Sequence, residues 1–201
     1  MPMKKLTLII ALFSIVLGRL TYAETIIALT SGNRLLIFDS ATPGTILRAV
    51  NVTGQTSVQH LALIDFRPGT GGLYAFSSPS CATPTQCSTD FYTIDYATGA
   101  ATRIGSVFNL YSVPPAPPES FDFDFNPTVD RIRFVDDRGN NLRIDPAQAT
   151  QVPTRDTQLA YASSDVHAAQ TPNIVGCAYT NNFVSEASRS WTSPFRPRRG
   201  F

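Results

Sequence analysis

The chain has 201 residues, 43% of them hydrophobic and 15% charged, which is the composition of a folded domain with a core rather than of a disordered chain. Residues 1–23 contain both lysines and one arginine, so the rest of the chain carries 13 basic and 15 acidic residues. This near balance predicts neither nucleic acid nor an anionic membrane as a partner. His60 and His167 are the only histidines, which excludes an all-histidine zinc site.

The N-terminus has the three parts of an export signal. A short positive segment, 1–5, precedes 13 apolar residues, 6–18, and small residues then lead to Ala23 and Glu24. The apolar run is shorter than the roughly 20 residues that a transmembrane helix needs, although an uncleaved anchor is the alternative. We therefore expect cleavage between Ala23 and Glu24, a mature domain over 24–182, and a periplasmic or extracellular location with no membrane partner after cleavage.

The rest of the chain predicts a succession of short β-strands. Each segment is apolar or alternating, rich in β-branched and aromatic residues, and separated from the next by turn residues such as Gly and Asn. The predicted strands are 25–29, 34–38, 46–52, 60–66, 72–77, 90–95, 101–105, 121–125, 130–135 and 141–145. The alternation of Phe121, Phe123 and Phe125 with Asp122 and Asp124 places the phenylalanines on one face of their strand.

Two patterns recur along the chain. The segment 64–70 (IDFRPGT) returns 59 residues later as 123–129 (FDFNPTV). A second pattern is an apolar strand that ends at an aspartate, and it occurs at Asp39, Asp95 and Asp145. We predict that these three aspartates form turns by accepting backbone amides two residues further on, and that they carry no chemistry.

Hairpins repeated every 50 to 60 residues predict an all-β, propeller-like array of antiparallel blades. The blades would be 25–52, 61–107 and 121–152, with 159–180 as the start of a fourth. The array would thus be incomplete. The competing architecture is a β-sandwich with the same number of strands.

Export permits disulfides, and the chain has three cysteines. Cys81 and Cys87 flank a short polar segment that is typical of a hairpin tip, so we predict a local disulfide between them. Cys177 lies in an apolar run and is expected to be a buried, unreactive thiol.

These motifs resemble the domain-of-unknown-function 4394 family. The resemblance lies in 28–44, in the two Asp-Phe-X-Pro segments around Asp65 and Asp124, in the NPTVDRIR run of 126–133, and in 140–143. It covers residues 25 to about 182. It implies an exported, mostly bacterial, propeller-like β domain with no assigned activity, and so it implies no catalytic or binding residues.

One loop is a weak candidate for a cation such as calcium. Asp136, Asp137 and Asn140 offer carboxylate and amide oxygens, but their spacing does not match a calcium loop. Arginines 131, 133, 138 and 143 lie among the nearby aspartates, so a turn with several ion pairs is the favoured interpretation, and no cofactor is predicted.

Asp65 and Asp124 occupy equivalent positions in two repeats. They could form a carboxylate pair for acid–base catalysis, but a position repeated in each unit favours a structural role in which each accepts backbone amides. Asp130, which stands where the preceding repeat has Gly71, and His60 are the mild candidates for a catalytic residue.

No serine has the surroundings of a catalytic nucleophile, including Ser57 and Ser164 near the two histidines. The sequence therefore favours a non-enzymatic module that presents loops on a propeller face to a protein or carbohydrate ligand. The alternative is a hydrolase or lyase whose site is spread over several blades.

The pattern of strands stops after residue 182. Residues 183–201 show no alternation and contain four arginines and two prolines. We predict a disordered basic tail produced by a truncation or a change of reading frame, with a basic arm that docks on the acidic body or on a partner as the alternative.

Overall fold

A computed structural model describes residues 23–56, 60–83, 86–110 and 119–180. These residues form 13 β-strands in three mostly antiparallel sheets. None of the described residues forms a helix with the length and apolarity to cross a membrane. The predicted export signal up to residue 22, the predicted tail over 183–201 and Ser57 lie outside the described residues.

The first sheet is a meander in the order β1-β2-β3. Its strands are β1 (Thr25–Leu29), β2 (Arg34–Asp39) and β3 (Ile46–Asn51). Asn33, with φ of 54°, takes a left-handed conformation in the tight turn between β1 and β2, which asparagine tolerates better than most residues.

The second sheet has six strands, in the order β12-β8-β7-β5-β4, with β6 paired to β7. Its strands are β4 (Leu61–Arg67), β5 (Gly72–Ser77), β6 (Ser80–Thr83), β7 (Gln86–Asp95), β8 (Ala100–Phe108) and β12 (Thr150–Gln151). The long β7–β8 hairpin turns at Gly99, whose φ is 82°.

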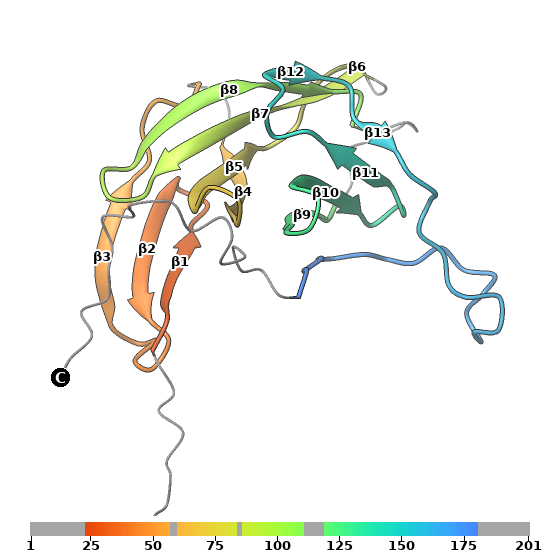
Figure 1. The fold of residues 1–201 in the computed structure, drawn as a ribbon, viewed down its shortest axis with the longest axis horizontal. Coiled ribbons are helices and arrows are strands. Elements are labelled where there is room, and N and C mark those ends of the chain that lie inside the picture. Colours follow the sequence, from red (N-terminus) through yellow and green to blue (C-terminus); the bar gives the residue numbers. More distant parts are fainter. Residues whose placement is uncertain (1–22, 57–59, 84–85, 111–118, 181–201) are drawn as a thin grey trace, which may run out of the picture.

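The third sheet has the order β13-β11-β10-β9. Its strands are β9 (Phe121–Asn126), β10 (Arg131–Asp136), β11 (Asn141–Ile144) and β13 (Thr154–Arg155). After β13 the chain forms a long loop that extends away from the sheets (Figure 1). It then returns to β9, where Cys177 and Tyr179 form hydrogen bonds.

The prediction of an all-β chain is confirmed, and the three sheets correspond to the three predicted hairpin units. Figure 1 shows the sheets following one another along an arc, from β1–β3 through β4–β8 to β9–β11. The exception is β12, which follows the third unit in sequence but joins the second sheet, parallel to β8. Within the described residues the sheets do not close into a ring.

The middle sheet is buried on both faces because its strands alternate two apolar sets. Leu73 and Ala75 of β5 pack toward the first sheet, in a cluster with Leu35. Tyr74 and Phe76 of β5 pack toward the third sheet. A sheet with apolar side chains on both faces must be covered on both, which explains why the three sheets stack in series.

The contact between the second and third sheets is aromatic. Phe76 lies 4.8 Å from Phe123 and 4.6 Å from Phe91, measured between ring centroids, and Tyr74 lies 5.2 Å from Phe125. The prediction for β9 is confirmed, since Phe123 and Phe125 are buried in this core and Phe121 packs against it.

Polar groups also join successive sheets. Asp65 of β4 accepts a hydrogen bond from the amide of Phe125 in β9, at 3.1 Å. Arg67 of β4 forms a two-point salt bridge with Asp130, which precedes β10. Each link connects one hairpin unit to the next.

Candidate functional site

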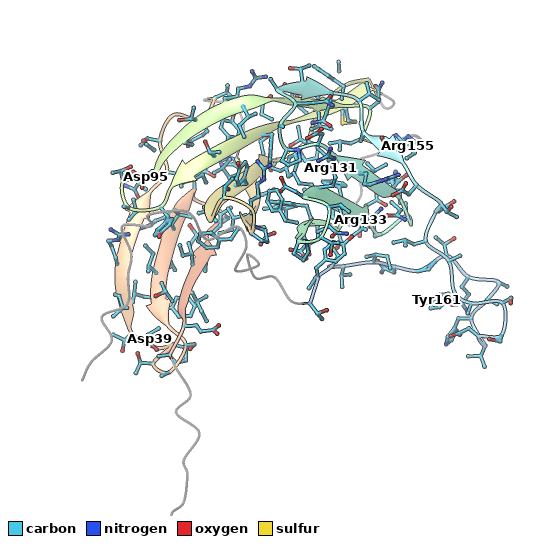
Figure 2. All side chains as sticks on the ribbon, in the orientation of Figure 1. Asp39, Asp95, Arg131, Arg133, Arg155 and Tyr161 are labelled. Atoms are coloured by element: carbon cyan, nitrogen blue, oxygen red, sulfur yellow. A yellow bond between two sulfur atoms is a disulfide. The ribbon has the colours of Figure 1, made fainter. Side chains whose placement is uncertain are left out.

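Three arginines lie on the outer face of the third sheet. Because side chains alternate along a strand, Arg131 and Arg133 of β10 point away from the core that buries Ile132. Arg143 of β11 is directly opposite Arg133 in the antiparallel register. Figure 2 shows Arg131 and Arg133 on this sheet, with Asp39 and Asp95 at turns of the other two sheets.

Asp156 compensates the repulsion between the two paired arginines. Its carboxylate accepts hydrogen bonds from Arg133 Nη1 at 2.6 Å and from Arg143 Nε at 3.1 Å and Nη2 at 2.6 Å. Hydrogen bonds from Arg143 and then from Arg133 lower the pKa of Asp156. Arg131 lies 3.4 Å from Asp145, again between guanidinium and carboxylate.

These arginines line a pocket of about 260 Å³, which we call the arginine pocket. Its lining residues are Asn126, Val129, Arg131, Ile132, Arg133, Arg143, Asp156 and Tyr179. A second pocket of about 310 Å³ shares Arg131 and Arg143 with it, and adds Asp145, Gln148 and Gln151. The three guanidinium groups of the arginine pocket have two carboxylate partners, Asp156 in the lining and Asp145 beside Arg131, which leaves an excess of one positive charge.

The chemistry of this lining favours binding over catalysis. Arginine stays charged at all physiological pH values and cannot act as a general base. Its planar fork of N–H donors matches a carboxylate, sulfate or phosphate group. The amides of Gln148 and Gln151 next to it can donate to and accept from neutral hydroxyl groups.

Tyr179 reaches the arginine pocket from a segment that lies along β9. Two carboxylates of β9 hold this segment by its backbone: Asp122 accepts the amide of Cys177 at 2.9 Å, and Asp124 accepts the amide of Tyr179. The hydroxyl of Tyr179 accepts a hydrogen bond from Arg133 Nε at 3.4 Å. Cys177 and Tyr179, two residues apart, thus bind Asp122 and Asp124, which are also two residues apart.

Asp65 and Asp124, the predicted pair, lie close enough for their carboxyl groups to interact. Burial, followed by the interaction with the side chain and charge of Asp124, raises the pKa of Asp65 to about 7, although the amides of Phe125 and Phe66 oppose this shift. Asp124 is 6% exposed, and each aspartate accepts a backbone amide of the following unit. This is the structural arrangement that the repeat predicts rather than an open catalytic pair.

The three predicted turn aspartates have the expected geometry. Asp39 accepts the amide of Ala41 at 2.7 Å, Asp95 that of Ala97 at 2.8 Å, and Asp145 that of Ala147 at 3.0 Å. Asp145 has a second contact, the ion pair with Arg131, so it also belongs to the surroundings of the site.

The structure joins Cys81 and Cys87 by a disulfide, across the β6–β7 hairpin. Cys177 carries a free thiol and is half-buried. Burial, and then the charges of Asp122, Asp124 and Asp65, raise the pKa of the Cys177 thiol to about 12, which keeps it neutral. The predicted cleavage site, Ala23 and Glu24, precedes β1, where Glu24 pairs with Ser40.

The weak calcium candidates form the β10–β11 turn. Asp136 is fully buried and accepts the amides of Arg138 and Asn140, both at 3.0 Å, and the side chain of Asn140 at 2.7 Å. Asp137 accepts the amide of Glu119 at 3.0 Å. Among the residues that the structure describes, no three His, Cys, Asp or Glu side chains are grouped to hold a metal ion.

The two mild catalytic candidates are in different surroundings. Asp130 has a φ of 50°, close to the 69° of Gly71 at the same point of the preceding unit, and its carboxylate binds Arg67. His60 lines a separate pocket of about 380 Å³ between β1 and β4. The ring of His167 lies beside the ring of Tyr161 in the long loop, with 5.6 Å between the ring centroids.

The expectation that arginines pair with aspartates around this turn is partly right. The carboxylate partners of Arg131, Arg133 and Arg143 are Asp145 and Asp156. Sequence reasoning missed Asp156 and Tyr179, because neither lies in a strand or a motif. The signal that could have found the site is the spacing of Arg131 and Arg133, two apart on one strand of a hairpin whose other strand carries Arg143.

One family model matches most of the chain. No curated protein matches the chain. The family model described as Domain of unknown function (DUF4394) matches residues 34–196, which include all three sheets apart from β1 and both aspartates that link successive units. The chain therefore belongs to the DUF4394 family.

Proposed function

We propose that this chain is an exported, non-enzymatic binding module whose arginine pocket takes an acidic carbohydrate. The observation that carries the proposal is the convergence of Arg131, Arg133 and Arg143 on one pocket with a single carboxylate among its lining residues. The adjoining pocket supplies amide groups for sugar hydroxyls. A recognition site of this kind commonly combines a few charged groups for orientation with neighbouring hydrogen-bonding groups.

The wider architecture that we propose is a propeller-like array in which the three sheets are successive blades. Its support is the burial of the middle sheet on both faces and the repeated link from an aspartate of one unit to an amide of the next. The segment that carries Cys177 and Tyr179 lies along β9 as β9 lies along β4, so it corresponds to the start of a fourth unit.

A periplasmic or extracellular location is part of the proposal. It rests on the signal pattern of residues 1–23 and agrees with the disulfide between Cys81 and Cys87, since such bonds persist in oxidising compartments. The ligand would then be a polymer or small molecule of the cell envelope or its surroundings.

The alternative function, a hydrolase or lyase with a dispersed site, has less support. Its best acid–base candidates are Asp65 and Asp124, and both oxygens of Asp65 and one of Asp124 already accept backbone amides. Activity on glycoside substrates that disappears in Asp130→Ala would favour this alternative.

The test is calorimetric titration of the mature protein with glucuronic acid, and with glucose as the neutral match. We expect saturable binding of glucuronate and none of glucose. Arg143→Gln should weaken glucuronate binding about tenfold or more, the scale of a lost charge-assisted pair of hydrogen bonds. Arg34→Gln removes the same charge from an exposed position of β2 and should leave the affinity unchanged. Equal binding of the two sugars, or equal effects of the two variants, would contradict the proposal.

A further inference from the structure

Three pockets follow one another around β11. The arginine pocket shares Arg131 and Arg143 with the second pocket of about 310 Å³. It shares Asp156 with a third pocket of about 200 Å³ at the β10–β11 turn, where Arg155 and Gln158 are among the lining residues. The second and third pockets have no lining residue in common, so the arginine pocket lies between them. We call this run of three pockets the extended site.

The size of the extended site fits a ligand larger than a single sugar. Pockets that hold small ligands typically have a volume of about 300–1,000 Å³. The arginine pocket, at about 260 Å³, and the third pocket, at about 200 Å³, are each below this range, and the second pocket only reaches its lower limit. The three pockets together fall well within it, which favours a ligand that spans them.

Arg155 gives the third pocket a positive charge of its own. It lies on the edge strand β13 and is exposed, on the same sheet as Arg131 and Arg133 (Figure 2). Its guanidinium donates to two neutral oxygens, the carbonyl of Asn109 at 2.5 Å and the side-chain oxygen of Asn140 at 3.3 Å. Neither bond compensates the charge of Arg155, which therefore remains available to an acidic ligand.

The extended site thus offers two excess positive charges in two different pockets. One lies in the arginine pocket, whose three arginines have Asp145 and Asp156 as partners, and the other is Arg155. We propose that the ligand is an oligosaccharide with at least two acidic sugars, one held in the arginine pocket and another at Arg155. This inference rests on the proposed function and narrows the ligand to a uronate polymer instead of a single acidic sugar.

Side-chain amides at the two ends of the extended site fit the hydroxyl groups of such a polymer. Gln158 in the third pocket donates from Nε2 to the carbonyl of Arg138 at 2.9 Å, and its Oε1 can accept a hydroxyl. Gln148 in the second pocket has a 3.4 Å contact with Asp145, which is long for a hydrogen bond and which a sugar hydroxyl can replace. A phosphodiester chain offers fewer hydroxyl groups to these amides, so the lining favours a sugar polymer.

Calorimetric titration of the mature protein with glucuronic acid, and with triglucuronic acid in the linkage of cellulose, tests this inference. The trimer presents carboxylates on neighbouring and on alternate sugars, so the result does not depend on the exact spacing of the pockets. We expect the trimer to bind at least tenfold more tightly, the scale of one further charge-assisted hydrogen bond. An advantage of about threefold or less, the statistical gain from three carboxylates at one site, would overturn the inference and leave the proposed function intact. Failure of both ligands to bind would reject the proposed function as well.

Arg155→Gln is the decisive variant. We expect it to leave glucuronate binding unchanged and to reduce the advantage of the trimer to about threefold. Arg48→Gln is the matched control, because Arg48 of β3 is exposed and also donates to neutral oxygens, the carbonyls of Tyr96 at 3.0 Å and Ala97 at 3.3 Å. It should keep the full advantage of the trimer. If Arg155→Gln weakens glucuronate as much as the trimer, the two acidic positions are not separate and the inference is wrong.

Two further titrations use the wild-type protein, so they do not depend on the folding of a variant. Cellotriose, the neutral match of the trimer, should not bind, and cellotriose binding as tight as that of triglucuronate would show that the extended site takes sugar rings without regard to charge. A thymidine trinucleotide should bind more weakly than triglucuronate. Tighter binding of the trinucleotide would assign the extended site to a phosphodiester polymer and reject the uronate.

Discussion

Gly105 is a position where the third unit approaches the second closely. It lies in β8, next to the two residues that pair with β12, Ser106 and Val107. A Cβ atom at Gly105 would lie 1.0 Å from the carbonyl oxygen of Ala149 and 2.0 Å from its carbonyl carbon. Both are backbone atoms, so a Gly105→Ala variant can be accommodated only if β12 moves away from β8.

The magnitude follows from what this displacement breaks. Loss of the ladder between β12 and β8 removes about two hydrogen bonds, at about 1 kcal/mol each. Overpacking of a close contact typically costs a further 1–3 kcal/mol, roughly, and the reduced freedom of the unfolded chain returns about 0.5–1 kcal/mol. We therefore expect Gly105→Ala to lower the free energy of unfolding by about 3 kcal/mol.

Urea denaturation followed by far-ultraviolet circular dichroism measures this loss. Gly44→Ala is the control, since a Cβ there meets no atom within 4 Å, and it should change the unfolding free energy by less than about 0.5 kcal/mol. Hydrogen exchange of the Ser106 and Val107 amides should accelerate in Gly105→Ala alone. If the two variants are equally stable, or if β12 keeps its protection, the close approach of the two units is wrong.

Two further predictions concern the disulfide and the export signal. Reduction of the Cys81–Cys87 bond, which closes a loop with a sequence separation of 6, should lower the free energy of unfolding by about 2 kcal/mol. Urea denaturation with and without reductant measures this change. Thiol titration of the unfolded, unreduced protein should find one free cysteine, and a result of three would refute the pairing. Mass spectrometry of the protein from its native host should find Glu24 as the first residue, because the apolar run and Ala23 form a cleavage site. Soluble protein that retains Met1 would contradict export.

Much of the local structure could be read from the pattern of side chains. The alternation around Phe123 and Phe125 predicts the buried face of β9, and the aspartates at 39, 95 and 145 predict turns whose amide bonds the structure contains. These features depend on residues within a few positions of one another, and local sequence is sufficient to specify them.

The features that the sequence did not predict depend on distant contacts. The two-residue strands β12 and β13 are too short to have a period, and they exist because a neighbouring strand offers free backbone groups. The prediction of 90–95 for the seventh strand was short, because β7 is extended from Gln86 by its pairing with β6 in the disulfide hairpin.

The candidate site shows the same division. The sequence by itself determined that Arg131 and Arg133 share one face of a strand, and that an aspartate stands at the same place in successive units. Only the tertiary structure decided that Asp156 lies between two arginines, that Tyr179 lines the arginine pocket, and that Asp65 and Asp124 lie near each other. The reason is physical: a strand period sets the direction of a side chain, whereas its partner is set by how the sheets stack and where the connecting loops return.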